Sequence, residues 1–309
     1  MQIIAIGEIL WDVFEAGKLL GGAPLNFSAS AQRLGDSVAL LTAVGKDELG
    51  NSALQRMAAL GLASDFVQVS QERNTGTAVV TIDGSGNASY VIERPAAFDD
   101  VHLNEALLRR LTAIQPAWLY FGTLAQTQAL NEANLNLLLE TLPGIRCFYD
   151  MNLREGHWNL ALIRRLSELA TVMKLNETEA ETLFQLTYPG EDYSLEQFCR
   201  IWSYSFKIET ICVTLGSEGC AIYAHETFSQ HSSFVVQVTD TVGAGDSFAA
   251  AFLHTYSRGW PIAKQAAFAN ALGALVASRA GATPDWTIDE CLQLIEQQSS
   301  QLSTLEQQA

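Results

Sequence analysis

The stretch Asp240-Thr-Val-Gly-Ala-Gly-Asp-Ser-Phe248 lies between a β-branched run and a run of good helix formers. Phe234-Val-Val-Gln-Val238 before it predicts a strand, and residues 247–256 after it predict a buried helix. The stretch is therefore interpreted as a strand-to-helix turn, in which glycines let the backbone approach a ligand. The amides of residues 243–245 precede the helical hydrogen bonds and lie at the positive end of the helix dipole, which favours an anion.

Asp246 places a carboxylate beside this predicted anion site. A carboxylate does not bind an anion itself, but it can take a proton from a hydroxyl while the amides hold phosphate oxygens. The alternative is an ordinary helix start, in which Asp240 or Asp246 caps the amides. From this stretch alone the two interpretations are evenly balanced.

The composition of the 309 residues is that of a globular protein, with 48% hydrophobic and 17% charged residues. The net charge of −16 argues against a nucleic acid or an anionic membrane as the main partner. The five cysteines lack metal-ligand spacing and are interpreted as reduced core thiols. The sequence has no signal-peptide pattern and no apolar run that could span a bilayer, so we expect a cytoplasmic protein.

A second glycine turn lies near the N-terminus. Residues 2–7 predict a strand of a parallel sheet, and residues 9–14 continue as an alternating extended segment. Gly21-Gly-Ala-Pro-Leu-Asn26 then leads into a helix that ends at Leu34. The two glycines would let a ligand lie against the backbone, and Asn26 offers a hydroxylated ligand both a donor and an acceptor. A glycine-rich turn with a buried asparagine is the alternative.

Residues 77–94 predict a β-hairpin that turns at Gly84-Ser-Gly-Asn87. Its mixed polarity indicates a sheet with one solvated or ligand-facing side, inserted away from the main core, with Arg94 at its exit. From residue 103 onward strands and helices alternate, which predicts a parallel sheet covered by helices on both faces. Ligands of such sheets bind beyond the carboxyl ends of the strands.

Polar clusters follow four of the predicted strands at the point where each strand ends. These clusters are Asp150-Met-Asn152-Leu-Arg154, Asn176-Glu-Thr-Glu179, Thr214-Leu-Gly216-Ser-Glu-Gly219 and Asp240 to Asp246. Each alone could be a cap or a turn, and Asn176 with Glu179 is also a capping arrangement. Helical patterns over 261–280 and 287–298 follow, and no linker divides the chain, so we expect one domain over residues 1–309.

The sequence has no Walker motif, zinc-protease helix or nucleophile elbow, and its five histidines stand apart from one another. What remains is an anion site, a carboxylate beside it, glycine turns and Arg154. Transfer of a phosphoryl group from ATP to a hydroxyl needs such a set, because it requires charge stabilisation, alignment and a base.

The chain resembles the ribokinase-like (PfkB) sugar kinases along nearly its whole length. The two motifs that carry the resemblance are Gly21-Gly-Ala-Pro-Leu-Asn26 and Asp240-Thr-Val-Gly-Ala-Gly-Asp246, in this order. The resemblance implies an α/β fold with a three-layer Rossmann-type core, a parallel central sheet and a small β-sheet lid at about residues 9–20 and 75–95. It also implies an ATP-dependent carbohydrate kinase that uses magnesium.

The resemblance further implies roles for the matching residues. Asp246 would be the catalytic base, next to an anion hole formed by Gly243, Ala244 and Gly245. The sugar would be held, together with Asp246, by Asp12, Gly22, Asn26, Arg94, Asn152 and Arg154. ATP would contact Asn176, Thr214, Gly216, Gly219, Gly243, Gly245 and Asn270. Glu179 would act on magnesium indirectly, and potassium would be held near Asp240, Val242, Ala277 and Gly281.

Within this family, Asp150-x-Asn152-x-Arg154 followed by Trp158 resembles the fructokinases and the 2-keto-3-deoxygluconate kinases. Keto-acid kinases usually carry Tyr-x-Arg on the lid strand to bind the carboxylate, whereas this chain has Tyr90-x-x-x-Arg94. We therefore expect a neutral sugar as substrate, foremost D-fructose, phosphorylated at a primary hydroxyl. A 2-keto-3-deoxygluconate kinase, another sugar or nucleoside kinase, and an inactive sugar-binding regulator are the alternatives.

The role of Arg94 is left open, because Glu93-Arg-Pro-Ala-Ala-Phe-Asp99 departs from the family's usual Arg-x-x-x-Ala-Asp pattern. The retained Asp246 argues against the regulator, since a binder does not need the base. Asp285 stands where several relatives have serine, which bears on the choice of cation. The expected partners are a small sugar and ATP, with a homodimer formed through the lid.

Overall fold

The computed structural model of the protein describes residues 1–15, 17–82 and 88–306. The chain divides into two compact units, Met1–Met173 and Lys174–Ala309. The expected hairpin turn at residues 84–87 lies outside the described residues. The expectation of one domain stays a prediction.

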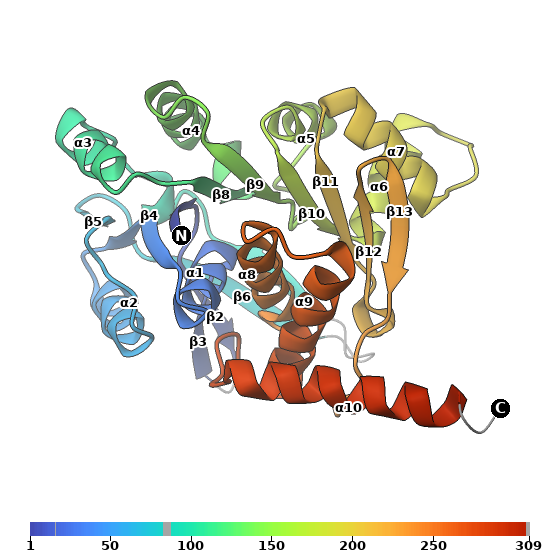
Figure 1. Ribbon diagram of the computed structural model, residues 1–309. Helices are drawn as coiled ribbons and strands as arrows, with labels where there is room; N and C mark the ends of the chain where they lie inside the picture. The colour runs from blue at the N-terminus through green and yellow to red at the C-terminus, as the bar shows by residue number, and fades with distance from the viewer. Residues whose placement is uncertain (16, 83–87, 307–309) are drawn as a thin grey trace. The chain divides into compact units, whose positions relative to one another are not determined.

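The first unit contains strands of two sheets, together with α-helices. The strands of its larger sheet are β1 (Gln2–Ile6), β4 (Ser37–Gly45), β5 (Val67–Ser70), β8 (Trp118–Gly122) and β9 (Arg146–Asp150). Its α-helices are α1 (Ala23–Arg33), α2 (Glu48–Ala59), α3 (Glu105–Ala113), α4 (Ala129–Thr141) and α5 (Leu160–Ser167). Figure 1 shows α1 and α2 on one face of these strands and α3, α4 and α5 on the other.

The strands of the larger sheet run in the order β9-β8-β1-β4-β5 within this unit, and all these pairs are parallel. Ile4 of β1 pairs with Ala39 on one side and with Leu119 on the other. Ile3, Ile4 and Ala5 have no exposed surface. A central parallel strand is covered on both faces, which is why β1 has a continuous apolar sequence. The predicted alternation of strands and helices is confirmed.

A separate four-stranded sheet, in the order β3-β2-β6-β7, also belongs to the first unit. Its strands are β2 (Leu10–Phe14), β3 (Gly17–Gly21), β6 (Gly76–Ile82) and β7 (Ala88–Ile92). Leu10, Ala78 and Ile92 form an apolar cluster with Phe98, which fixes the sheet on one side. The predicted small sheet, built from two segments that are distant in sequence, is confirmed. Its action as a lid stays a prediction.

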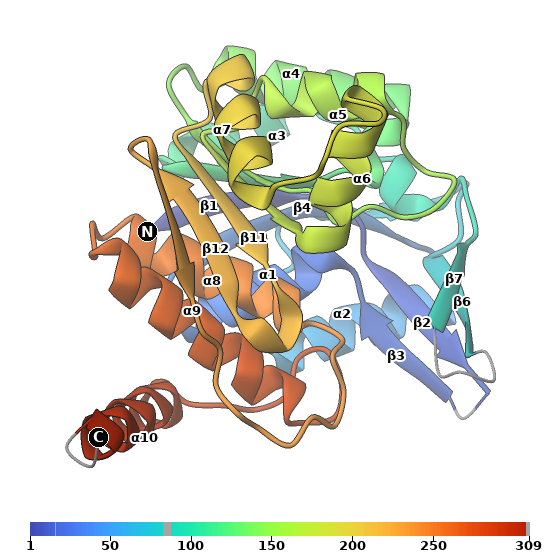
Figure 2. The same cartoon turned by 90° about the vertical axis from the view of Figure 1, so that its right-hand side faces the viewer.

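The second unit begins within β10 (Val172–Asn176), and its strands run in the order β13-β12-β11-β10. The further elements are β11 (Thr210–Thr214), β12 (Cys220–Ala224), β13 (Thr227–His231), α6 (Glu177–Thr187), α7 (Leu195–Phe206), α8 (Ala244–Tyr256), α9 (Ile262–Ala277) and α10 (Ile288–Glu306). Figure 2 shows α6 and α7 on one face of β11 and β12, and α8 and α9 on the other.

The predicted strand at residues 234–238 is wrong, because this segment is irregular. Val235 is fully exposed and Val238 is 59% exposed, so the β-branched run has no sheet to pack into. The strands that precede α8 are instead the antiparallel pair β12 and β13, which the sequence analysis missed. Helix α8 also begins at Ala244, three residues before the predicted start, since the glycine turn itself supplies its first turn.

The cysteine prediction is confirmed, since all five are free and buried. Burial raises the pKa of the Cys147 thiol to about 12, which makes it unreactive. Within the described part of the chain, no helix combines the length and the apolar character that crossing a membrane requires.

Candidate active site

The glycine turn at the start of α8 has a backbone that only glycine tolerates. Gly243 is the N-cap residue, with a φ of 79° in the left-handed region. A Cβ atom added to Gly243 would clash with the carbonyl oxygen of Ala282. The turn therefore packs closely against the segment that follows α9, and this contact fixes the position of the first amides of α8.

Asp246 is the third residue of α8, and 9% of its surface is exposed. Ser247 donates its amide to the carbonyl oxygen of Gly243 at 2.9 Å, which closes the first helical turn. Ala244 donates to the Thr241 carbonyl oxygen at 3.3 Å, so this amide already has a long bond within the turn. The predicted base and the predicted anion-hole residues are thus consecutive groups of one helix N-terminus.

Asp240 ties the α8 turn to the segment after α9. Its two carboxylate oxygens accept the amides of Val242 and Gly281, each at 3.0 Å. The amides of Thr239 and Asp240 donate to the carbonyl oxygen of Ala277 at 2.8 and 3.1 Å. The structure therefore brings together the four residues predicted to lie near potassium. Asp240 has a structural task there in any case, because it holds the glycine turn in place.

Asn176 and Glu179 form a reciprocal capping box at the start of α6. The Asn176 side chain accepts the Glu179 amide at 2.8 Å, and the Glu179 carboxylate accepts the Asn176 amide at 2.9 Å. The capping interpretation of this pair is confirmed. Glu179 is 8% exposed.

The loop between β11 and β12 carries Thr214, Gly216 and Gly219. Thr214 donates its hydroxyl to the carbonyl oxygen of Leu175 at 3.5 Å, next to the end of β10. Gly219 has a φ of 110°, and a Cβ atom there would clash with the carbonyl oxygen of His231. This loop is therefore packed tightly against the end of β13.

Asn270 of α9 holds the chain just after β13. Its side-chain amide donates to the carbonyl oxygens of His231 and Ser232, both at 3.2 Å, and the residue is 4% exposed. The structure thus gives Asn270 a supporting position. Its predicted contact with adenine stays a prediction.

The described residues contain no group of three or more histidine, cysteine, aspartate or glutamate side chains that could hold a metal ion. Magnesium in phosphoryl transfer is commonly bound by one or two carboxylates together with phosphates and water, so it does not require such a group. The buried carboxylate of Glu179 suits this mode of binding.

In the first unit, the predicted sugar residues Asp12, Gly22 and Asn26 are on or beside β2 and α1. Asp12 is 9% exposed, and a Cβ atom on Gly21 would lie 2.5 Å from its Oδ2 atom. Gly22 has a φ of 115°, and Asn26 donates its amide to the Gly22 carbonyl oxygen at 3.0 Å. The two glycines thus make room for the Asp12 carboxylate and set the start of α1.

Glu8 is a buried carboxylate beside these residues that the sequence analysis did not single out. It is 6% exposed, and its carboxylate accepts the amide of Ala23 at 3.2 Å at the N-terminus of α1. The available signal was a carboxylate directly after the first buried strand.

Asn152 and Arg154 lie just after β9. The Asn152 side chain accepts a hydrogen bond from Nη1 of Arg154 at 2.7 Å. The backbone φ of Asn152 is 44°, which is unusual for a residue other than glycine. Asp150, in the same motif, is fully buried and accepts the hydroxyl of Tyr120 at 3.0 Å. Asp150 therefore belongs to the core, while Asn152 and Arg154 form a polar pair at the strand end.

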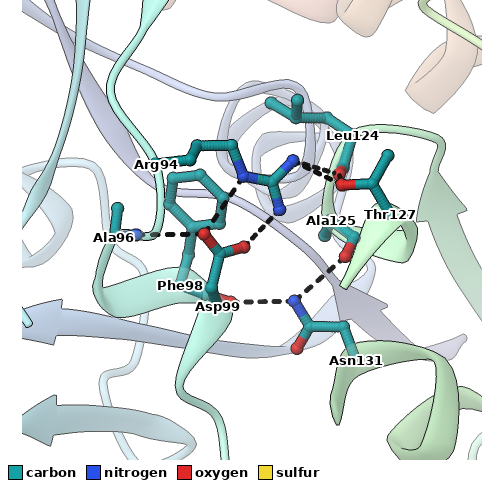
Figure 3. Close-up of polar contacts among 8 residues, drawn as sticks. All are labelled: Arg94, Ala96, Phe98, Asp99, Leu124, Ala125, Thr127 and Asn131. Carbon is teal, nitrogen blue, oxygen red and sulfur yellow. Dashed lines mark hydrogen bonds and ion pairs between the residues drawn. The ribbon is translucent and has the colours of Figure 1, made fainter. Parts of the chain in front are cut away.

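Arg94 is part of a buried network with Asp99 (Figure 3). Its guanidinium donates from Nε to the Asp99 carboxylate at 3.1 Å and from Nη2 to the other Asp99 oxygen. Nη1 donates to the Leu124 carbonyl oxygen at 2.7 Å and to the Thr127 hydroxyl at 2.6 Å. The Arg94 side chain is 6% exposed. Because a guanidinium has five N–H donors, four of them are directed at these protein acceptors.

The predicted sugar residues other than Asp246 all belong to the first unit, and the predicted nucleotide residues and Asp246 all belong to the second. Each set is well ordered by hydrogen bonds or close packing within its own unit. These are the groups that phosphoryl transfer to a hydroxyl needs: amides at a helix N-terminus, a carboxylate base and polar side chains.

Known proteins with similar sequences and structures agree with this description. The chain is 28% identical to fructokinase-1 of Zea mays, over 95% of this chain and 97% of the maize protein. A solved structure of fructokinase with bound ATP from Xylella fastidiosa has a TM-score of 0.83 at 22% identity, covering 96% of this chain and 99% of that one. A 2-dehydro-3-deoxygluconokinase from Thermotoga maritima has a TM-score of 0.82 at 20% identity, covering 96% and 99%.

The two solved structures establish the fold, which is that of the ribokinase-like sugar kinases. The family model described as pfkB family carbohydrate kinase matches residues 6–289, so the chain belongs to this family. It is an ATP-dependent carbohydrate kinase.

Proposed function

We propose that this kinase transfers the γ-phosphoryl group of ATP to a primary hydroxyl of D-fructose and forms fructose 6-phosphate. The observation that carries this choice of sugar is the Arg94 network. Arginine frequently binds a carboxylate through a bidentate pair of donors. Arg94 already directs four of its five donors at Asp99, Leu124 and Thr127, so a neutral ketohexose fits this chain better.

In the proposed reaction, Asp246 takes the proton of the sugar hydroxyl as the new bond to phosphorus forms. The helix dipole favours the ionised form of Asp246, which makes it a weak base. A weak base is sufficient because phosphoryl transfer is largely dissociative, so the hydroxyl becomes acidic only as the new bond to phosphorus forms. The backbone at Gly243, Ala244 and Gly245 stabilises the charge on the phosphoryl oxygens.

Magnesium, when bound, would neutralise charge on the phosphates, and Glu179 is the residue that would hold it, through water. The nucleotide would be held by Asn176, Thr214, Gly216, Gly219 and Asn270. The close-packed loop after β11 would lie along its phosphates. On the sugar side, Asp12 and Asn26 would bind hydroxyl groups above the close backbone at Gly22. Asn152 and Arg154 would orient the sugar from the end of β9.

Potassium is proposed to bind near Asp240, Val242, Ala277 and Gly281 and to support the glycine turn from behind. We expect the rate in potassium to exceed the rate in a bulky organic cation at matched ionic strength. Equal rates in the two salts would contradict this part of the proposal.

We also propose that the protein is cytoplasmic and that it forms a homodimer through the four-stranded sheet. Val79 and Val91 pair directly across β6 and β7, and they are 39% and 62% exposed. These two neighbouring apolar side chains on one face of the small sheet are the observation that supports association through it. Light scattering should give twice the mass of the chain, and Val91→Lys should reduce it to one chain.

The proposed function is tested by following sugar-dependent ADP formation from ATP and magnesium. The panel contains fructose, ribose, glucose, 2-keto-3-deoxygluconate and adenosine. We expect fructose to give the highest kcat/KM. A protein that binds a sugar but forms no ADP with any of them would be a regulator instead, and the proposal would be wrong.

A further inference from the structure

A cavity of about 550 Å³ lies within the first unit, between the segments that follow β8 and β9. It is lined by the 3₁₀ helix Ala125–Thr127 and the start of α4, and by the loop after β9 and the start of α5. Arg165 of α5 pairs with Glu132 of α4 at 3.3 Å, which joins the two helices. Ligand cavities commonly have volumes of about 300–1,000 Å³, so this cavity has room for a small molecule.

Gln126 lines this cavity and has a buried side chain whose amide the fold does not use. The residue is 1% exposed, and its backbone is fixed because its main-chain amide donates to the Thr123 carbonyl oxygen at 3.0 Å. Among the described residues, neither Oε1 nor Nε2 of Gln126 has a hydrogen-bond partner. Buried polar side chains are nearly always hydrogen-bonded, because leaving them unsatisfied lowers stability. The Gln126 amide therefore indicates a partner from outside the chain.

Other polar side chains along the cavity are already bonded within the protein. The Thr127 hydroxyl accepts Nη1 of Arg94 at 2.6 Å (Figure 3). The Asn159 side chain caps α5 by accepting a main-chain amide at 2.9 Å. Gln126 differs from these residues because its donor and its acceptor both remain for a ligand.

The chemistry of the lining favours a neutral ligand with hydroxyl groups. The charges of Glu132 and Arg165 balance each other, and burial together with a nearby positive charge lowers the pKa of His157, so its imidazole is neutral at pH 7. The Gln126 amide offers one group that accepts and one that donates, which matches hydroxyl groups. Trp158 adds a large apolar ring face to the lining. Sugar rings combine hydroxyl groups with an apolar face.

We propose that this cavity is a second sugar site, which binds a neutral monosaccharide through the Gln126 amide and the ring of Trp158. Oε1 of Gln126 accepts a hydrogen bond from one sugar hydroxyl, and Nε2 donates to another. The apolar face of the sugar lies on Trp158. The site goes beyond the proposed function, because Asn152, Arg154 and the other residues proposed to hold the substrate are not among the described residues that line the cavity.

The test follows Trp158 by fluorine NMR in the full chain, with its six tryptophans replaced by 5-fluorotryptophan. Trp158→Phe identifies the Trp158 signal, and D-fructose, D-glucose and D-ribose are added in turn without nucleotide. We expect at least one sugar to shift this signal saturably, and Gln126→Met to weaken that binding by about tenfold or more, because two hydrogen bonds are lost. Gln32→Met, at an exposed glutamine of the same unit, is the control and should equal the wild type. The proposal is overturned if no sugar shifts the signal, or if Gln126→Met binds as tightly as the wild type.

Kinetics separates this site from the substrate site. Gln126→Met should leave kcat, and KM for the phosphorylated sugar, within about twofold of the wild type. A KM that rises in parallel with the Kd read from Trp158 would place Gln126 in the substrate site and would overturn the proposal of a second site. If the wild type phosphorylates none of the sugars, the proposed function is wrong, but the Trp158 titration still decides whether the cavity binds a sugar.

The melting temperature distinguishes a ligand-binding amide from a structural one. Methionine is close to glutamine in size and removes the two unsatisfied polar groups, so Gln126→Met should melt at the same temperature as the wild type or higher. A melting temperature lower by more than about 4 °C, or a variant that does not fold, would show that the amide stabilises the protein itself. Either result would overturn the proposal.

Discussion

Arg94 and Lys174 are both buried basic residues, but their surroundings differ. Arg94 is surrounded by acceptors of its own unit, chiefly the Asp99 carboxylate and the Leu124 carbonyl oxygen. The ammonium of Lys174 instead lies at the positive end of α8. The Arg94 network joins segments of the first unit that are distant in sequence, whereas Lys174 lies beside the glycine turn that precedes the predicted base. We therefore expect changes around Arg94 to lower stability, and changes at the start of α8 to lower activity.

The largest effect expected is that of Asp246→Asn, at the start of α8. This change keeps the shape of the side chain but removes its ability to take a proton. We expect kcat to fall by about 10²–10⁴, with little change in sugar and ATP affinity or in melting temperature. Steady-state kinetics measures kcat, and calorimetry on the same preparation measures the affinities and the melting temperature. A nearly normal kcat would show that Asp246 is not the base, and loss of sugar binding would make it a ligand residue.

For Arg94 we expect a loss of stability. Arg94→Met leaves the Asp99 carboxylate buried without its cation, and such a change costs about 3–5 kcal/mol of unfolding free energy. Arg109→Met is the control, because its ion pair with Glu105 has side chains that are 73% and 88% exposed. The control should lose no more than about 1 kcal/mol in urea unfolding. If Arg94→Met unfolds like the wild type and loses only sugar binding, Arg94 is a substrate residue.

A smaller difference in stability is expected between alanine variants of two glycines in the second unit. Gly243 and Gly259 both have a positive φ, but only Gly243 has backbone atoms in the space of a Cβ atom. Gly259→Ala should therefore cost about 1 kcal/mol for the left-handed conformation alone. Gly243→Ala should cost more, and it should also lower kcat because the turn must shift. Equal losses in the two variants would mean that the packing against Ala282 does not position the turn.

Part of the site could be predicted from sequence because the responsible residues are close together in the chain. Asn176 and Glu179 are three residues apart, and the capping box follows from that spacing. The segment 234–238 was predicted wrongly because a β-branched run indicates a strand only if another strand is available to pair with it. The pairing of Asp240 with Gly281, and of Lys174 with the α8 turn, joins residues far apart in sequence, which no local pattern reveals.

The hydrogen-bond network of Arg94 could not be predicted either. The sequence shows Arg94 and Asp99 five residues apart, a spacing that indicates no particular contact. The structure adds acceptors from Leu124 and Thr127, thirty and more residues away. These acceptors are what distinguish a structural arginine from a carboxylate clamp, and they bear directly on the choice of substrate.

Competition between D-fructose and 2-keto-3-deoxygluconate tests the central claim most directly. Equal concentrations of the two are mixed with a limiting amount of ATP, and the two phosphorylated products are quantified by mass spectrometry. Their ratio equals the ratio of the two kcat/KM values. A keto acid whose carboxylate is not clamped by Arg94 should be disfavoured by about tenfold or more, so fructose 6-phosphate should predominate by at least that factor. A larger amount of the phosphorylated keto acid would contradict the account.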